Sequence, residues 1–273
     1  QDNNGCTHTA DTVITEPATP ISLAHTFTNI LCNGDSTGSI TIAGIGSVGN
    51  YSYSIDGGQT ILPSNTFTNL GAGSYLMYVV DSNGCDTAEG INLTQPATAV
   101  NLTLVNSVDV NCFGQSTGRI DVIGAGGTGQ INYGLNQTVN TSPITFFGNL
   151  AANSYMVYAQ DFNGCLDSLS VNITQPASPL AFDTIIETDL QCFNTATGQI
   201  EIVGAGGSPS YLYAIDNGPL QPSGTFTIGN GGAYVVRITD SLGCSITDTA
   251  NINEPSLLVA AINNVTNESC EFD

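Results

Sequence analysis

The stretch DSNGCDTAEGINLTQPATAV at residues 81–100 returns as DFNGCLDSLSVNITQPASPL at 161–180 and as DSLGCSITDTANINEPSLLV at 240–259. Each copy holds a glycine turn that ends in cysteine, a run with the alternation of a β-strand, and a Gln-Pro or Glu-Pro step. Self-similarity at a fixed period indicates a tandem array of one structural module. The sequence therefore predicts three copies of a β-rich repeat of about eighty residues.

A second motif recurs in front of each copy and fixes the register of the repeats. It reads NILCNGDSTGSITIAGIG from residue 29, DVNCFGQSTGRIDVIGAG from residue 109 and DLQCFNTATGQIEIVGAG from residue 189. We place the repeats at residues 18–96, 97–176 and 177–255. Residues 1–17, with Cys6, match the last strand of a preceding repeat, and residues 256–273, with Cys270, match the first strand of a following one.

The pattern within each repeat is that of short β-strands broken by turn residues. For the second repeat it predicts strands over 101–112, 119–125, 130–135, 143–147, 154–161 and 165–174. The Asn-Gly pair in DFNGC is typical of a tight hairpin. Tyr75, Tyr155 and Tyr234 each follow a Gly/Ala-rich corner, which is the position of a tyrosine corner in a Greek-key sandwich, whereas Tyr53, Tyr133 and Tyr213 are expected in the opposite sheet. The fold class is all-β, as tandem immunoglobulin-like Greek-key sandwiches.

Composition limits the partners of the chain. It has 273 residues, 23 acidic residues, only two basic ones and a formal net charge of −21. Such a surface repels nucleic acid and anionic membranes, and no run of 18 apolar residues is present to insert into a bilayer. Because lysine, the commonest protection of exposed strand edges, is absent, we expect copies to associate as a homo-oligomer or lateral bundle.

Eight cysteines in a fixed register predict disulfides and an oxidising, extracellular setting. Pairing neighbours in sequence uses all eight: Cys6–Cys32, Cys85–Cys112, Cys165–Cys192 and Cys244–Cys270. Pairing within one repeat, as Cys32–Cys85, leaves Cys6 and Cys270 to pair with cysteines of neighbouring repeats. The two ends of an immunoglobulin-like sandwich also permit a bond across a junction, such as Cys32–Cys165. We take the sequence-adjacent set as the expectation.

Catalytic motifs are not found. The two histidines, His8 and His25, lie outside the repeated motifs, so no shared catalytic role is available to them. The G-x-G-x-x-G patterns that begin at Gly44 and Gly124 are followed by predicted strands, whereas a phosphate-binding loop needs a helix there. The sequence therefore predicts a protein that is not an enzyme and that needs no cofactor.

Calcium is the one metal for which candidate ligands exist. The carboxylates are Asp56, Asp81, Asp161, Asp216 and Asp240, all in predicted turns. The spacing of a calcium-binding loop is absent, and the second repeat has Asn136 where the first has Asp56. Capping of the turns by aspartate explains the same positions.

Asp-Ser or Asp-Thr pairs follow the second cysteine of each repeat. They resemble the O-glycosylation acceptor pattern of Bacteroidota, which implies modification at Thr12, Thr87, Ser168 and Thr249. The alternative is that Asp and Thr are common on exposed faces of strands.

The combined pattern C-F-G-x-S/T-x-G-x-I-x-V-x-G-x-G-G, Y-x-Y, L-x-A-G-x-Y, D-x-N-G-C and I-T-Q-P resembles the SprB-type repeat of giant gliding-motility adhesins in Bacteroidota. The resemblance covers the three repeats and both terminal fragments. It implies a cell-surface appendage exported by the type IX secretion system, which helps cells to attach, to glide or to capture prey. Contact with surface glycans would then belong to a tip outside this segment.

Two classes of function follow. In the first, the repeats form the non-catalytic stalk of a long extracellular adhesin or filament. In the second, each repeat is a carbohydrate-binding module that recognises surface polysaccharide. Carbohydrate sites use exposed aromatic platforms, whereas aromatic residues make up 7% of this chain and most of its tyrosines have the alternation of core positions. We therefore expect the stalk.

Overall fold

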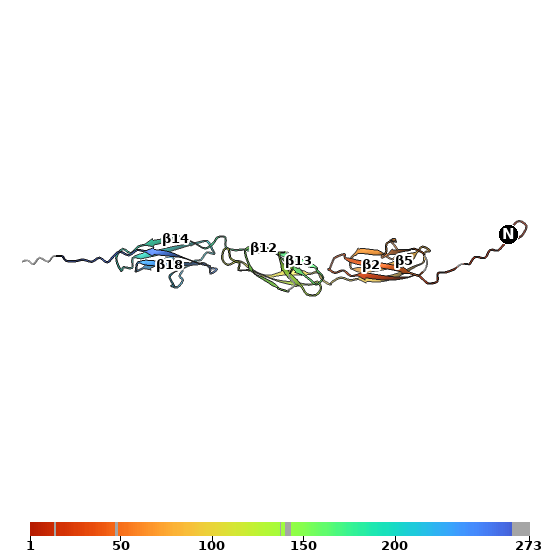
Figure 1. The fold of residues 1–273 in the computed structure, drawn as a ribbon, viewed down its shortest axis with the longest axis horizontal. Coiled ribbons are helices and arrows are strands. Elements are labelled where there is room, and N and C mark those ends of the chain that lie inside the picture. The colour runs from red at the N-terminus through yellow and green to blue at the C-terminus, as the bar shows by residue number, and fades with distance from the viewer. Residues whose placement is uncertain (14, 47–48, 137, 140–142, 264–273) are drawn as a thin grey trace, which may run out of the picture. The chain divides into compact units, whose positions relative to one another are not determined.

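The computed structural model describes residues 1–273 apart from 14, 47–48, 137, 140–142 and 264–273. The described residues form strands β1 to β19 and contain no helix (Figure 1). They accordingly contain no helix of membrane-spanning length. The all-β prediction is confirmed.

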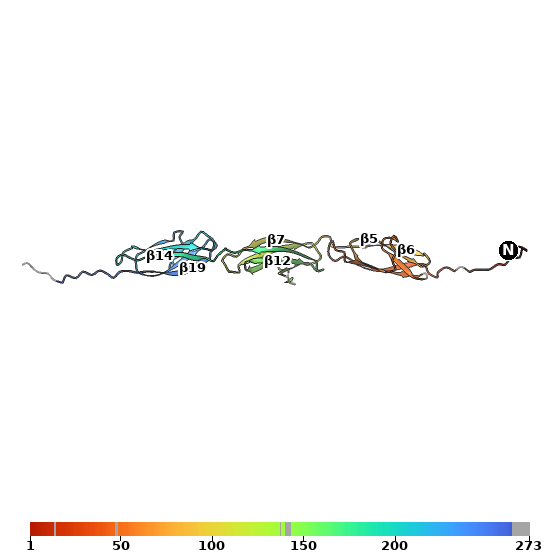
Figure 2. The same ribbon diagram turned by 90° about the horizontal axis from the view of Figure 1, so that it is seen from above.

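Six strands make up the first repeat, in two three-stranded sheets. They are β1 (Ser22–Thr28), β2 (Gly38–Ile45), β3 (Tyr51–Ser54), β4 (Thr66–Leu70), β5 (Gly73–Asp81) and β6 (Asp86–Leu93). One sheet has the order β1-β2-β4 and the other the order β3-β5-β6, and all pairs are antiparallel. In Figure 2, β5 and β6 lie side by side as this pairing requires. The chain crosses between sheets after β2, β3 and β4, which gives the Greek-key topology of an immunoglobulin-like sandwich.

The other two repeats have the same strand order. The second contains β7 (Asn101–Val108), β8 (Gly118–Ala125), β9 (Asn132–Leu135), β10 (Thr138–Val139), β11 (Phe146–Leu150), β12 (Asn153–Gln160) and β13 (Leu166–Ile173). The third contains β14 (Ala181–Thr188), β15 (Gly198–Ala205), β16 (Leu212–Ile215), β17 (Thr225–Ile228), β18 (Gly232–Thr239) and β19 (Ser245–Ile252). The six strands predicted for the second repeat are confirmed, and the short edge strand β10 is an addition.

The chain divides into two compact units, and the boundary falls within the second repeat. The first unit comprises 1–103, 123–144 and 157–169, and the second comprises 104–122, 145–156 and 170–273. We describe each unit by itself. The repeat boundaries at residues 18–96, 97–176 and 177–255 stay a prediction.

Alternating apolar residues fill the space between the two sheets of a repeat. In the first repeat, Ile40 and Ile42 of β2 pack with Met77 of β5, and all three side chains are fully buried. The third repeat builds the corresponding core from Ile200, Ile202 and Val236. Because successive side chains of a strand point to opposite faces, this alternation directs the polar residues to solvent.

A tyrosine corner closes every repeat, as predicted. The hydroxyl of Tyr75 donates to the carbonyl of Gly71 at 3.0 Å, that of Tyr155 to Ala151 at 2.9 Å, and that of Tyr234 to Asn230 at 2.7 Å. The placement of Tyr53 in the opposite sheet was wrong, because β3 pairs with β5 and Tyr53 stands across from Val79. Both sets of tyrosines therefore belong to one sheet.

The assignment of the two terminal fragments to neighbouring repeats stays a prediction. The described residues of 1–17 and of 256–263 contain no strand. A strand needs a hydrogen-bonded neighbour, and none is present for either fragment within the described chain. The remaining residues of the expected final strand, 264–273, lie outside the described residues.

Replacing Tyr155 with Phe should cost about 1 kcal/mol of unfolding free energy, because the ring is kept and its part-buried hydrogen bond to the carbonyl of Ala151 is lost. Urea unfolding of Y155F beside the parent chain measures this. The matched control is Y158F on the same strand, since the Tyr158 hydroxyl makes no hydrogen bond within the described chain. Equal destabilisation by both substitutions would contradict the role of the corner.

Candidate functional site

Two disulfides join consecutive repeats, and they are the main candidate for a functional feature. Cys32 bonds to Cys165, and Cys112 bonds to Cys244, with Cα–Cα distances of 5.5 and 5.7 Å. We call the loops at 31–34, 111–114 and 191–194 front loops, and the turns at 81–85, 161–165 and 240–244 back turns. In both bonds a front loop is linked to the back turn of the next repeat.

The sequence-adjacent pairing was therefore wrong. Cys32 and Cys165 are bonded to each other rather than to Cys6 and Cys192, and Cys112 and Cys244 are bonded to each other rather than to Cys85 and Cys270. Neighbouring cysteines in sequence are separated by two complete strands, such as β6 and β7, each eight residues long. Each strand runs the length of its sandwich, about 27 Å, whereas a disulfide requires Cα atoms within about 7 Å. Cys270 lies outside the described residues.

The back turn is shaped by a buried aspartate. The N–H of Cys165 donates to the Asp161 carboxylate at 2.9 Å, and the N–H of Thr128 donates to its other oxygen at 2.7 Å. Asp240 receives the equivalent bonds from Cys244 at 2.9 Å and from Ser208 at 3.0 Å. These bonds satisfy a carboxylate that is only 4% exposed in both repeats, and they fix the backbone of the cysteine in the turn.

The front loop is held by the residue that precedes the repeated proline. The N–H of Gly34 donates to the Gln95 side chain at 2.8 Å, and the N–H of Gly114 donates to that of Gln175 at 2.8 Å. In the third repeat the N–H of Asn194 donates to Glu254 at 2.7 Å. The sequence analysis identified the Gln-Pro or Glu-Pro step only as part of the repeated motif and missed this role. The signal available was that only Gln or Glu precedes the proline.

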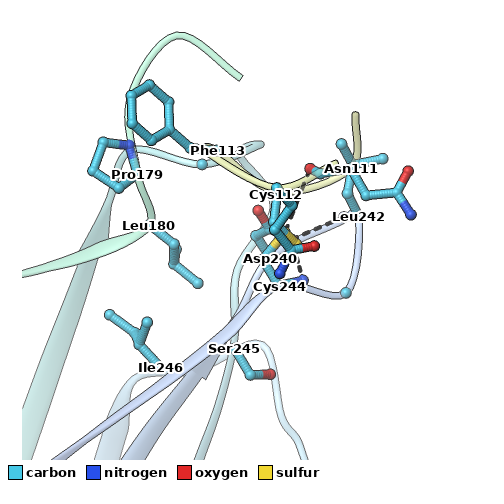
Figure 3. Close-up of a pocket in the computed structure, with 13 residues that line it drawn as sticks. Asn111, Cys112, Phe113, Pro179, Leu180, Asp240, Leu242, Cys244, Ser245 and Ile246 are labelled. Atoms are coloured by element: carbon cyan, nitrogen blue, oxygen red, sulfur yellow. Dashed lines mark hydrogen bonds between the residues drawn. A yellow bond between two sulfur atoms is a disulfide. The ribbon is translucent and has the colours of Figure 1, made fainter. Parts of the chain in front are cut away.

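At the occupied junctions, front loop and back turn are in direct contact. The carbonyl oxygen of Leu31 lies 3.4 Å from the Cys165 sulfur and accepts a hydrogen bond from the Asn163 side chain at 3.1 Å. The carbonyl oxygen of Asn111 lies 3.4 Å from the Cys244 sulfur. Figure 3 shows the second junction, where Cys112 and Cys244 meet beside a hollow lined by Phe113, Pro179 and Leu180. The back cysteines are buried there, with 8% and 9% exposure.

The glycine loops pack closely against the segment that enters their own repeat. Strands β3 and β9 follow them, as predicted. Gly126 has a φ of +79°, and a Cβ there would lie 2.0 Å from the carbonyl oxygen of Ala99. Gly206 has the same relation to Pro179. A side chain is therefore excluded by both backbone conformation and space, and the loop can pack against the segment that enters its repeat.

The calcium candidates cap turns in the structure. Asp161 and Asp240 bind the backbone as described above, and Asp81 accepts the N–H of Asn83 at 2.9 Å and of Cys85 at 2.8 Å. Asp216 accepts the N–H of Val235 at 3.0 Å. Hydrogen bonds from the Ser54 side chain and the Thr60 backbone lower the pKa of Asp56 to about 2, so this carboxylate is ionised at neutral pH. Within the described ranges, no three His, Cys, Asp or Glu side chains gather as metal ligands.

The other residues singled out from the sequence lie apart from the junction chemistry. Of the glycosylation candidates, Thr12, Ser168 and Thr249 are exposed and Thr87 is half-buried. Thr87, Ser168 and Thr249 lie on β6, β13 and β19, the strands after the back cysteines. His8 is exposed, and His25 Nδ1 lies 3.9 Å from Glu89 Oε2. Modification of these positions stays a prediction.

The comparison with protein families matches each of the three repeats. Three segments, residues 24–60, 104–140 and 184–220, match the family model of the SprB repeat. Each segment contains one front cysteine and is shifted by eighty residues from the last. No curated protein matches the chain.

Several solved structures resemble this chain at low sequence identity. Drosophila OTK, extracellular domains 3-5, has 12% identity and a TM-score of 0.33 over 80% of this chain and 91% of that one. Chicken CNTN1 FN1-FN3 has 10% identity and a TM-score of 0.30 over 88% and 100%. Invasin, a bacterial integrin-binding protein, has 13% identity and a TM-score of 0.30 over 85% and 60%. At these scores the likenesses carry no argument about function.

Lowering the pH should break the hydrogen bond between Glu254 and the front loop of the third repeat, and it should leave the front loop of the first repeat unchanged. Hydrogen bonds from the N–H groups of Asn194 and Gly231 lower the pKa of Glu254 below its ordinary value of 4.5. The stabilisation is therefore fully present above pH 4.5 and is lost as the pH falls through the lowered pKa. The amide NMR signal of Asn194 should shift with this titration.

A second front loop and a conservative substitution serve as controls for this titration. The Gly34 amide, which is bonded to neutral Gln95, should not follow the same curve. The substitution Glu254→Gln should abolish the titration at Asn194 while keeping the hydrogen bond. An Asn194 titration that persists in E254Q would contradict the assignment.

Proposed function

We propose that this chain is a non-catalytic, tension-bearing spacer in the stalk of an extracellular adhesin or surface filament. The observation that carries the proposal is the pair of disulfides that link each front loop to the back turn of the next repeat. Disulfides persist in oxidising, extracellular settings, which supports a location at the cell surface. The SprB repeat matches support the same setting. The resemblance extends the proposal to a type IX secreted adhesin of Bacteroidota, used for attachment or gliding.

The order of the bonds along the chain explains how tension would be carried. Cys32 and Cys244 are 212 positions apart in sequence. One covalent path between them runs through the 32–165 bond and then along the chain to 244, and a second runs along the chain to 112 and then through the 112–244 bond. Each path contains about eighty residues of backbone. The two paths are parallel, so they share the load.

This arrangement limits how far the segment can stretch even when every repeat unfolds. An extended chain spans at most about 3.6 Å per residue, so 212 residues would reach roughly 760 Å and eighty residues roughly 290 Å. The disulfides therefore reduce the maximum extension of the segment between Cys32 and Cys244 by roughly 470 Å. Either bond alone is enough to impose the limit, because each bypasses more than 130 residues of sequence. The second bond adds a second load path.

Single-molecule stretching of the chain between its ends tests the proposal. The oxidised parent, the C32S/C165S variant and the C112S/C244S variant should all reach the same limited length. The variant with all four substitutions should extend by roughly 470 Å more, as should the parent under reductant. The matched control is Cys6→Ser, which removes a free thiol and should change nothing. Equal final lengths for parent and quadruple variant would overturn the proposal.

A further inference from the structure

The two disulfide-linked junctions differ in one kind of side chain. The first junction, which the 32–165 bond closes, has the pair Asn33-Gly34 in its front loop and the pair Asn163-Gly164 in its back turn. The second junction has Phe113-Gly114 and Leu242-Gly243 at the same positions. The glycines are therefore common to both junctions, whereas the side-chain amides at these positions are confined to the first.

An Asn-Gly pair is the sequence in which asparagine loses its amide most readily. The backbone nitrogen of the glycine attacks the side-chain carbonyl carbon of the asparagine, a C–N bond forms, and ammonia leaves with the proton of the glycine N–H. Water then opens the resulting succinimide ring to aspartate or to isoaspartate, in which the main chain runs through the side-chain carbon. Glycine favours the attack because it has no side chain to hinder the approach.

In the closed first junction, the amide of Asn163 is bound across the junction. Its Nδ2 donates to the carbonyl oxygen of Leu31 in the front loop at 3.1 Å. The neighbouring N–H of Gly164 donates to the carbonyl oxygen of Asp161 at 3.1 Å. The leaving nitrogen and the attacking nitrogen are therefore both held by hydrogen bonds. Because the bond to Leu31 depends on the front loop, it lasts only while the junction stays closed.

Asn33, on the other side of the same junction, is held by its own repeat. Its Nδ2 donates to the carbonyl oxygen of Pro96 at 2.7 Å, and the N–H of Gly34 donates to the Gln95 side chain at 2.8 Å. Neither hydrogen bond involves the back turn of the second repeat, so opening of the junction leaves both in place. Asn33 is therefore an Asn-Gly pair whose protection does not depend on the junction.

We propose that Asn163 is a deamidation site that the closed junction protects, and that its deamidation after the junction opens weakens reclosure. An aspartate at position 163 has no N–H group to donate to Leu31, and its carboxylate faces a carbonyl oxygen instead. Isoaspartate adds a further backbone carbon to the turn in which Asp161 holds the N–H of Cys165. The second junction is immune at the same position, because Leu242 has no amide to lose.

Deamidation rates in the whole chain test the protection. The parent and the C32S/C165S variant are incubated at neutral pH, and peptide mass spectrometry follows the conversion of each asparagine. Asn163 should convert about tenfold faster in the variant, because its hydrogen bond to Leu31 is lost. Asn33 should stay slow in both chains. Asn217, in an exposed Asn-Gly pair of the third repeat, should convert at the same rate in both.

The substitution Asn163→Asp, in a chain with its cysteines intact, measures the consequence for reclosure. In a glutathione redox buffer, the equilibrium constant for the 32–165 bond should fall about tenfold, because a hydrogen bond is replaced by two facing acceptors. The 112–244 bond of the same chain should keep its parent value. The matched control is Asn83→Asp, which adds the same charge to a back turn outside both bonded junctions and should change neither constant.

Other outcomes overturn the proposal. Equal rates at Asn163 in the parent and in C32S/C165S would show that the junction does not protect this residue. An equal rise at Asn33 would assign the change to unfolding of the repeats, and an unchanged 32–165 equilibrium in N163D would exclude an effect on reclosure. The inference uses the junction geometry on which the proposed function rests, but the two fail separately. Intact 32–165 and 112–244 bonds in the parent leave the spacer proposal standing whatever the rate at Asn163.

Discussion

The front cysteine and the back cysteine of one repeat are on opposite ends of the same sandwich, and this separation governs the rest of the structure. A disulfide tolerates only a few ångströms between its Cα atoms, so the two cannot bond to each other across the length of a strand. A bonding partner for either cysteine therefore lies in a neighbouring repeat, as Cys165 does for Cys32 and Cys244 does for Cys112. Disulfides in small extracellular domains ordinarily stabilise a single domain, whereas here they connect one domain to the next.

The geometry that directs the cysteines is local and repeated. An aspartate four residues before the back cysteine accepts its N–H, and this happens even at Asp2 and Cys6, at 2.9 Å, where no sandwich surrounds the turn. The same turn is therefore formed by its own five residues. Gln95, Gln175 and Glu254 provide the second local device by holding the front loops. The back turns and the held front loops fix the positions of the thiols before a disulfide forms. This reduces the conformational entropy that is lost when the bond forms.

Much of this could be predicted from the sequence, because it depends on short patterns. The alternation of apolar and polar residues predicted the strands, and the Asn-Gly pair predicted the hairpin. The position of Tyr155 after a Gly/Ala-rich corner predicted the tyrosine corner, in which its hydroxyl donates to Ala151. The disulfide pairing could not be settled in the same way, because the spacing of the cysteines along the chain permits several pairings and only the tertiary fold shows which of them are close in space. The pairing of β3 with β5 was missed for the same reason, since alternation shows the buried face of a strand and not its neighbour. The role of Glu254 was missed because the Gln or Glu that precedes each proline shows that a long polar side chain is kept there, but not that it bonds a backbone amide sixty residues away.

The central claim is that the covalent links run from one repeat to the next. Digestion of the oxidised chain under acidic, thiol-blocked conditions, followed by mass spectrometry of the cross-linked peptides, tests it most directly. The account predicts peptides that join Cys32 to Cys165 and Cys112 to Cys244, with Cys85 and Cys192 carrying the blocking group in the monomer. Peptides that join Cys85 to Cys112, or Cys165 to Cys192, would contradict it.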